Sequence, residues 1–284
     1  MNWFDEGALY SQIAAFLRED LGRGDITTQS IIARNTRARG RFVAGEKMIV
    51  AGLEAAEEVF LTLDSQQQLE AFVGDGEEIE AGKVIARTIG FADVLLAGER
   101  VALNLLQRLS AVASLTNRFV SAVEGTRAVI VDSPQTTPGM RMLEKYAVQL
   151  GGGSSQSFGL DDGVMITANH IDLAGGVGPA VRKAKDILGR LKKIAVEVSD
   201  ESEVRDALKH GADVLMFVRL TLPTLNRLVP LARELSPAVI VECSGNVTLE
   251  SVRAYAEAGV DIISIESLTN STRAMSVSFQ VQPF

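Results

Sequence analysis

The chain has 284 residues, of which 46% are hydrophobic and 23% charged, and its 28 basic and 36 acidic side chains give a formal net charge of −8. This composition is typical of a folded globular protein and excludes a disordered or collagen-like chain. The acidic balance, without a basic arm or stripe, argues against nucleic acid as a partner. Cys243 is the only cysteine, which excludes an internal disulfide and fits a reducing, cytoplasmic location. Residues 1–20 have neither the basic start of a signal peptide nor the apolar run of a membrane span, so we expect no membrane partner.

The first part of the chain predicts an α+β domain. Apolar residues at helical spacing predict helices over residues 8–17, 53–63 and 95–124, the last of which ends at Gly125. The strands expected between these helices are residues 41–43, 48–50, 69–73 and 77–86, the last two joined by a tight turn at residues 74–76.

After Gly125, short apolar strands alternate with amphipathic helices. The predicted strands are Ala128–Val131, Val164–Ile166, Ile194–Val198, Val214–Phe217, Val239–Val241 and Ile262–Ile265. The predicted helices include Pro179–Leu188, Glu201–His210, Pro223–Leu235 and Leu249–Ala258. This alternation, without a Gly-x-Gly-x-x-Gly turn, favours an α/β barrel over a dinucleotide-binding sheet. We therefore predict an α+β domain over residues 1–110 and an α/β barrel over residues 111–271, with residues 272–284 returning to the first domain as a strand.

A set of segments spread over the chain points to one family. The segments are Gly24–Thr28, Gly98–Asn104, Thr136–Arg141, Glu144–Val148, Gly151–Gly153, Asn169–Ile171, Val196–Val198 and Ala258–Asp261. In order and spacing they resemble the quinolinate phosphoribosyltransferase (nicotinate-nucleotide pyrophosphorylase) family over essentially the whole chain. The resemblance implies an N-terminal sandwich-like domain, an incomplete, TIM-like α/β barrel, and a homodimer or higher oligomer in which each subunit completes its neighbour's site. It also implies a glycosyltransferase of NAD biosynthesis that joins quinolinate to phosphoribosyl pyrophosphate with Mg²⁺, releasing carbon dioxide and pyrophosphate to leave nicotinate mononucleotide.

The resemblance also implies roles for individual residues. Catalysis would fall to Glu197 and to Arg100, which would reach across the dimer, and the matched positions expected to bind substrate are Asn169, His170, Ser244 and Gly245. Other site positions depart from the family pattern. Pro134 and Gln135 replace an Arg-Lys pair, Ser157 replaces an arginine, Thr167 a lysine, Val218 an aspartate, and Glu266 a glycine.

These departures bear on charge, because both family substrates are polyanions that arginine and lysine bind through charge-assisted hydrogen bonds. Val218 offers no carboxylate oxygen to Mg²⁺, so we expect no protein metal site, and Mg²⁺ only if the family's reaction survives. Glu197 ends an otherwise apolar strand and needs a partner, for which Arg219 is the expected ion pair. His170 has no Cys, Ser or second His nearby in sequence, so a structural hydrogen-bonding role is favoured over catalysis.

Three functions remain open at this point. The first is an active quinolinate phosphoribosyltransferase. The second is a diverged enzyme of the same fold that acts on a less anionic ligand. The third is a non-catalytic subunit or sensor, a pseudoenzyme that could donate Arg100 to an active paralogue in a heteromer. The loss of cations together with the retention of Arg100 favours the third slightly over the second, and both over the first.

Overall fold

The computed structural model describes residues 5–189 and 192–284, and the chain divides into two compact units. The first unit comprises Met1–Asn117, Thr137–Gly152 and Ser271–Phe284, and the second comprises Arg118–Thr136 and Gly153–Asn270. The boundary predicted at residue 110 falls inside the continuous helix α4 (Ala92–Ala122). Helix α5 (Arg141–Leu150) belongs to the first unit, where the Tyr146 hydroxyl donates a hydrogen bond to Asp75 Oδ2 at 2.9 Å.

The first unit contains a four-stranded antiparallel sheet in the order β12-β1-β5-β3. These strands are Val277–Pro283, Arg37–Ala44, Val84–Phe91 and Leu69–Ala71. Burial alternates along β1, so one face of the sheet is buried and the other faces solvent. On the buried side, Phe42 packs against Phe60 and Phe279 with ring centroids 6.2 and 4.5 Å apart. A separate pair, β2 (Met48–Ile49) and β4 (Glu78–Ile79), completes the strands of this unit.

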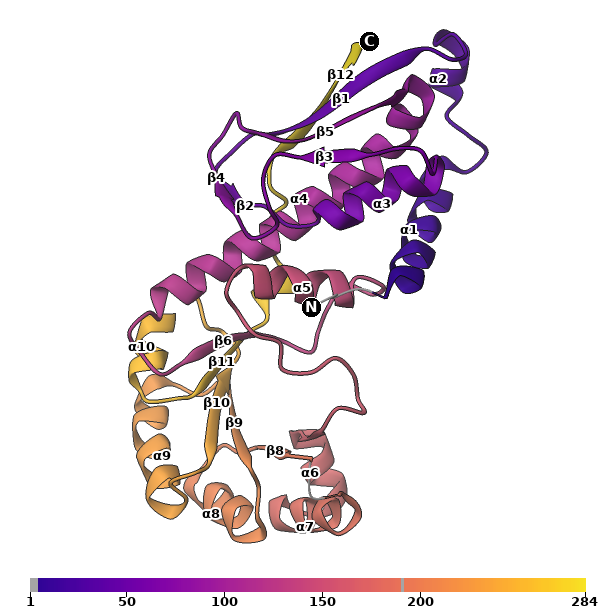
Figure 1. Ribbon diagram of the computed structural model, residues 1–284. Coiled ribbons are helices and arrows are strands. Elements are labelled where there is room, and N and C mark those ends of the chain that lie inside the picture. Colours follow the sequence, from indigo (N-terminus) through magenta and orange to yellow (C-terminus); the bar gives the residue numbers. More distant parts are fainter. Residues whose placement is uncertain (1–4, 190–191) are drawn as a thin grey trace. The chain divides into compact units, whose positions relative to one another are not determined.

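Two helices of the first unit begin at an aspartate side chain that caps them. Figure 1 shows α3 (Leu53–Leu63) along the buried face of the sheet. Helix α1 (Glu6–Leu21) begins before the predicted residue 8, because the Asp5 side chain accepts the Ala8 N–H at 2.9 Å. Helix α2 (Ile26–Ile31) is capped in the same way by Asp25. The single strand predicted over residues 77–86 is wrong, since β4 and β5 are separate strands with a turn that contains Gly82 at a φ of 84°.

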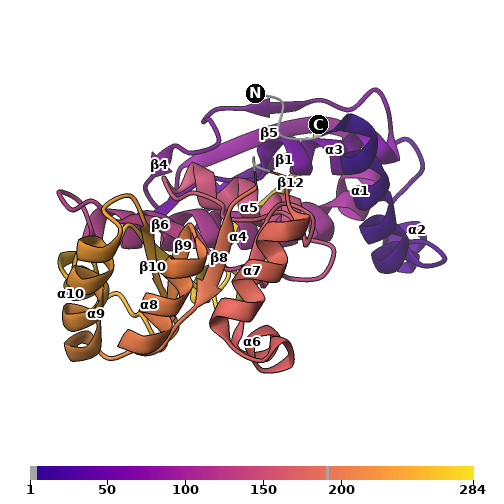
Figure 2. The ribbon, with the colours of Figure 1, turned by 90° about the horizontal axis from the view of Figure 1, so that it is seen from below.

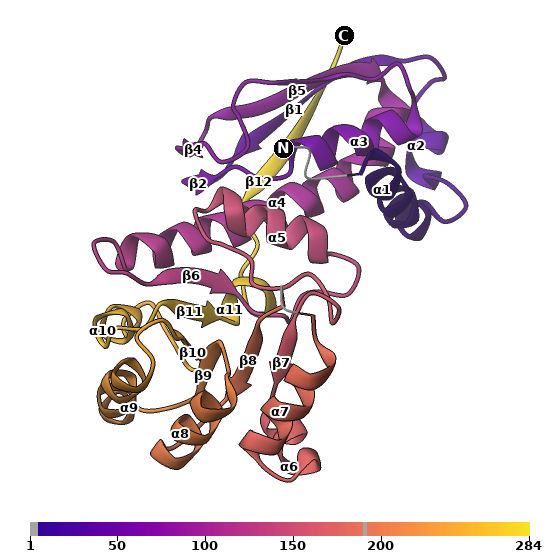
Figure 3. The same cartoon turned by 60° about the horizontal axis from the view of Figure 1, so that its bottom comes forward.

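The second unit is an incomplete α/β barrel of six parallel strands in the order β6-β11-β10-β9-β8-β7. In chain order the strands are β6 (Val129–Asp132), β7 (Val164–Ile166), β8 (Ile194–Glu197), β9 (Val214–Val218), β10 (Ile240–Ser244) and β11 (Ile262–Ile265). The helices of this unit are α6 (Ala168–Ala174), α7 (Val177–Ile187), α8 (Glu201–His210), α9 (Leu222–Leu235), α10 (Val252–Glu257) and α11 (Ser267–Asn270). Figures 2 and 3 show α7 to α10 on the outer side of the strands. The predicted fold class is therefore confirmed, and within residues 5–189 and 192–284 no helix is long and apolar enough to cross a membrane.

Candidate functional site

The carboxyl ends of the six parallel strands lie at one edge of the second unit's sheet, where enzymes of this architecture carry their chemistry. The segments that directly follow the strands are residues 133–136, 167–170, 198–200, 219–221, 245–248 and 266–270. Arg219 is the one lysine or arginine in these segments. A site formed at this edge is therefore poor in positive charge.

The strand register places two carboxylates in one row on the inner face of the barrel. Met216 of β9 is the register neighbour of both Glu197 on β8 and Glu242 on β10. Register neighbours in a sheet point to the same face, so the three side chains share it. Two strand spacings separate Glu197 from Glu242 by about 10 Å. Val218 and Ser244 form the next row toward the carboxyl ends. The base of the site is thus lined by two acids, apolar side chains and the Ser244 hydroxyl.

Glu242 is the most enclosed acid of this row, with 3% of its surface exposed. Its Oε2 accepts a hydrogen bond from Gln156 Nε2. Burial raises the pKa of Glu242 to about 7, which the Gln156 hydrogen bond opposes. The buried Gln156 Oε1 and Ser155 Oγ atoms have no hydrogen-bond partner within the described part of the chain. Burial also raises the pKa of the neighbouring Cys243 thiol to about 12, so that this thiol is not a nucleophile at neutral pH.

Glu197 does not form the ion pair expected with Arg219. Its Oε2 instead accepts the Ala168 N–H at the start of α6, at 3.0 Å. Arg219 has a φ of 55°, its N–H donates to the Ser244 carbonyl at 2.8 Å, and its side chain lies against Gly245. The Arg219 side chain is exposed and has no ion pair or hydrogen bond among the residues that the structure describes. It is the one cation at the strand ends that is free to meet a ligand.

Helix α6 begins with the residues expected to bind substrate, and they form a cap. Thr167 Oγ1 lies 2.8 Å from His170 Nδ1, and the Thr167 N–H donates to the same nitrogen at 3.1 Å. The contact between Thr167 and His170 forms a capping box at the start of α6, and the role of His170 stays a prediction. Asn169 and His170 are both exposed. Ser157, in the loop that precedes β7, donates its hydroxyl to the Gly159 carbonyl at 2.9 Å.

The loop after β6 is held to helix α11. Pro134 and Gln135 are exposed, and the Gln135 N–H donates to Ser133 Oγ at 3.0 Å. The Gln135 carbonyl accepts from Thr269 Oγ1 at 2.7 Å. Glu266, directly after β11, is exposed and adds a carboxylate to this side of the site.

Few side chains that could ligate Mg²⁺ gather at the described strand ends. Among residues 5–189 and 192–284 there is no group of three or more His, Cys, Asp or Glu side chains that could hold a metal ion. Val218 ends β9, the strand between β8 and β10, and its side chain has no oxygen that could bind a metal ion.

Arg100 lies in the first unit, on α4. Its side chain is 74% exposed and its Nη1 pairs with Asp20 Oδ1 at 2.9 Å. An exposed ion pair of this kind holds the guanidinium weakly, so Arg100 is available to another molecule.

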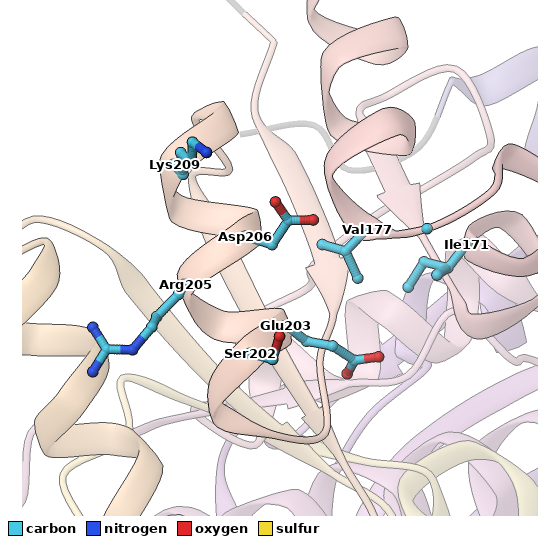
Figure 4. A pocket seen from close by; sticks show the side chains of 8 residues that line it. Ile171, Val177, Ser202, Glu203, Arg205, Asp206 and Lys209 are labelled. Carbon is cyan, nitrogen blue, oxygen red and sulfur yellow. The ribbon is translucent and has the colours of Figure 1, made fainter.

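A hollow of about 440 Å³ lies elsewhere in the second unit, between α6, α7 and α8. Its lining is Ile171, Gly176, Val177, Ser202, Glu203, Arg205, Asp206 and Lys209. Its carboxylates already have local partners, because Glu203 accepts from Ser199 and Asp206 accepts the Gly178 N–H at 2.7 Å. Figure 4 shows Arg205 pointing away from Val177, and Arg205 pairs with Glu201 at 2.7 Å. The strand ends therefore remain the better functional site.

The pair formed by Gln156 and Glu242 is the part of the site that the sequence did not single out. Glu242 carried the same signal as Glu197, a lone acid in an apolar strand, and that signal could have identified it. Nothing in the sequence marks Gln156 as its partner, because 86 positions separate the two residues.

Comparison with known proteins gives consistent results for both units. The chain matches the models of the quinolinate phosphoribosyl transferase N-terminal domain over residues 25–110 and C-terminal domain over residues 112–280. It is 41% identical over 267 residues to a probable nicotinate-nucleotide pyrophosphorylase (carboxylating) of Bacillus subtilis (strain 168), covering 94% of this chain and 91% of that protein. The corresponding protein of Synechocystis is 38% identical over 266 residues, covering 94% and 90%. Among solved structures, the nicotinate-nucleotide pyrophosphorylase of Francisella tularensis aligns over 98% of each chain with a TM-score of 0.91 and 33% identity. That of Ehrlichia chaffeensis aligns with a TM-score of 0.92 and 33% identity, over 99% of this chain and all of the other.

Proposed function

The chain belongs to the quinolinate phosphoribosyl transferase family of NAD biosynthesis, and we propose that it is a member in which the family's reaction is weak or absent and whose role is that of a non-catalytic subunit. The observation that carries this proposal is the lack of cations at the strand ends, where Arg219 alone remains. Quinolinate is a dicarboxylate and phosphoribosyl pyrophosphate carries two phosphate groups, so both need positive charge at the site.

The size of the loss follows from the four replaced cations. A hydrogen bond to a charged group contributes about 1.5–3 kcal/mol. Four such contacts amount to about 6–12 kcal/mol if their contributions add. At about 1.4 kcal/mol for each factor of ten, this corresponds to four to eight orders of magnitude in affinity or rate.

One acid at the site increases this loss. Glu266 is exposed directly after β11 and stands where the family pattern has a glycine. Glu197, in the inner row of the barrel, is a position that the family shares and adds nothing to the loss. Like charges repel, so Glu266 weakens polyanion binding beyond the loss of the cations alone.

The subunit role rests on Arg100. Its exposed guanidinium is held only by the surface ion pair with Asp20 in the part of the chain that the structure describes, and the family resemblance gives this arginine a role in the partner's site. A chain that keeps this residue while its own site lacks cations can complete the site of an active relative in a heteromer. Cys243 is buried and needs no oxidising compartment, which supports a cytoplasmic location for such an assembly.

A second candidate function is catalysis or binding with a less anionic ligand. The observation that favours it is the pair of buried atoms without partners, Ser155 Oγ and Gln156 Oε1, beside Glu242. A buried polar atom without a hydrogen bond is costly, and a ligand that donates hydrogen bonds would remove this cost. Electron density for such a ligand in a crystal of the protein as purified would favour this candidate over the subunit.

The direct test is an assay of nicotinate mononucleotide formation from quinolinate and phosphoribosyl pyrophosphate with Mg²⁺. We expect little or no product from the wild type, and a gain of activity when Pro134→Arg, Gln135→Lys, Ser157→Arg and Thr167→Lys are combined. The control carries Asn226→Lys and Ala254→Arg on the exposed sides of α9 and α10, which add cations away from the strand ends. Wild-type turnover comparable with that of an active relative would overturn the proposal.

The subunit role is tested by co-expression with a family member that has all four cations. We expect a mixed oligomer on native mass spectrometry. Arg100→Ala in this chain should then lower the turnover of the mixed oligomer. Failure to form the mixed oligomer, or turnover that is unchanged by Arg100→Ala, would exclude donation of this arginine.

A further inference from the structure

The solvent face of the first unit's sheet gathers arginines and phenyl rings. Residues at alternate positions of β1 point outward, and three of them are Arg37, Arg39 and Arg41. The register places Arg87 of β5 directly beside Arg41, and Phe91 beside Arg37. We call the set Arg37, Arg39, Arg41, Arg87, Phe72 and Phe91 the arginine face.

Each of three arginines on this face lies over a phenyl ring. The Cζ atom of Arg37 is 5.3 Å from the ring centre of Phe91, and that of Arg87 is 5.6 Å from the ring centre of Phe72. Arg39 lies in the same way over Phe284 at 5.3 Å. A stacked guanidinium is held flat while its N–H groups stay available to an acceptor. The rings themselves are partly exposed, Phe72 to 47%.

The charge of the arginine face is mostly not neutralised within the protein. Arg87 pairs with Glu70, and Arg41 Nε donates to the neutral Gln280 side chain at 2.9 Å. Arg37 and Arg39 have no hydrogen bond or ion pair from their side chains among the residues that the structure describes.

One further acid lies within reach of this charge. Arg37 contributes to lowering the pKa of Asp64, after the larger effects of hydrogen bonds from Gln66 and Gln67. The arginine face thus holds four arginines with one direct acidic partner, Glu70, in a chain whose net charge is −8.

We propose that the arginine face binds single-stranded nucleic acid, with the arginines contacting phosphates and the phenyl rings stacking on bases. Outward residues of one strand are about 7 Å apart, so Arg37, Arg39 and Arg41 form an evenly spaced row of phosphate contacts. Open antiparallel sheets bind single strands by combining positive charge with aromatic platforms. The sequence showed no basic stripe, because the stripe is assembled from alternate residues of β1 and from β5.

An acidic polypeptide is the other polyanion to consider. Its carboxylates would pair with the arginines, but it has no groups that need the exposed phenyl rings. A single-stranded nucleic acid uses both the charges and the rings, and it presents phosphates to which the planar guanidinium is well matched. The observations therefore favour nucleic acid, and binding is expected to be weak and sensitive to salt because the protein as a whole is acidic.

The test measures fluorescence anisotropy of a labelled oligouridylate of about 20 nucleotides with the full chain, in about 50 to 200 mM KCl. Three or four phosphate contacts predict that log K falls with log salt concentration with a slope of about −2 to −3. Combining Arg39→Gln with Arg41→Gln should weaken binding more than tenfold at low salt and reduce the slope by about 1.4. Phe72→Ala should weaken binding about fivefold or more and leave the slope unchanged, because stacking releases no ions.

The matched control combines Arg205→Gln with Arg253→Gln, which removes the same charge from exposed ion pairs of the second unit. It should bind the oligonucleotide as the wild type does. Thermal melting checks that the variants at Arg39 and Arg41 remain folded. No binding at the lowest salt overturns the proposal, as does equal weakening in the control. Competition by a glutamate-rich peptide of the same charge, as effective as unlabelled oligouridylate, would assign the face to an acidic protein instead.

Discussion

Glu242 makes the stability of the second unit depend on pH. Burial raises its pKa from the ordinary value of 4.5 to about 7, and the hydrogen bond from Gln156 opposes this rise. The native state therefore holds the proton more tightly than the unfolded state does. Between pH 4.5 and about 7 the unfolded chain has lost the Glu242 proton while the native state retains it. The free energy of unfolding therefore falls as pH rises through this window. At about 1.4 kcal/mol for each pKa unit, the free energy of unfolding falls by about 3 kcal/mol across this window.

The variant Glu242→Gln removes the ionisation while it keeps the size of the side chain and a group that can hydrogen-bond to Gln156. In urea unfolding followed by circular dichroism, we expect the wild type and the variant to be similarly stable at about pH 4.5. At about pH 8 the variant should be more stable by about 3 kcal/mol, because the wild type then carries a buried charge. The control Glu266→Gln alters an exposed carboxylate and should show no such divergence between the two pH values. A stability difference between wild type and Glu242→Gln that is the same at both pH values would refute the argument.

Three further substitutions test the first unit by urea unfolding. Glu144→Ala should destabilise this unit by about 3–5 kcal/mol, because Glu144 is fully buried and accepts hydrogen bonds from Arg108 Nε and Nη2 at 3.0 and 2.7 Å. An unchanged stability would show that this ion pair is dispensable. Gly40→Ala should cost about 1–3 kcal/mol, because its new methyl group would overlap the Phe279 ring, and a cost near zero would mean that the ring moves aside. Arg100→Ala should change stability by less than about 1 kcal/mol, since its ion pair is exposed, and a larger loss would give this residue a structural role.

The strands of the second unit were predictable because each is an apolar run between polar segments. Every one of the six strands begins within one residue of its prediction. At the carboxyl ends the largest difference is in β10, which was predicted to end at Val241 and continues to Ser244. A hydrophobic run stops at the acid Glu242, but the strand does not, because Gln156 supplies a hydrogen bond to that acid inside the barrel. Tertiary contacts of this kind cannot be read from the local pattern.

The site was predictable in its location and not in its contacts. The strand ends were identified from the alternation of strands and helices alone, whereas the roles given to the residues there stay predictions. The ion pair between Glu197 and Arg219 was wrong, because it assumed that neighbouring strand ends bring opposite charges together. Arg219 instead takes a left-handed backbone conformation, and its side chain lies against Gly245. Glu197 accepts a backbone N–H at the start of α6, a partner that has no signature in the sequence.

The residues that stand in place of cations have local roles of their own, and this leads to a final prediction. The Thr167 hydroxyl takes part in the capping box of α6, and its Oγ1 lies 2.8 Å from His170 Nδ1. Thr167→Lys alone should therefore lower stability by about 1 kcal/mol, the usual loss for an N-cap residue. Thr167→Ser keeps the hydroxyl and is the matched control, and urea unfolding measures both. If Thr167→Lys and Thr167→Ser were equally stable, the cap would contribute nothing, and the residue would be explained by the absent charge alone. If the cap contributes as expected, restoring a lysine for activity has a structural cost, and the present loop is adapted to holding its own helix rather than to holding a phosphate.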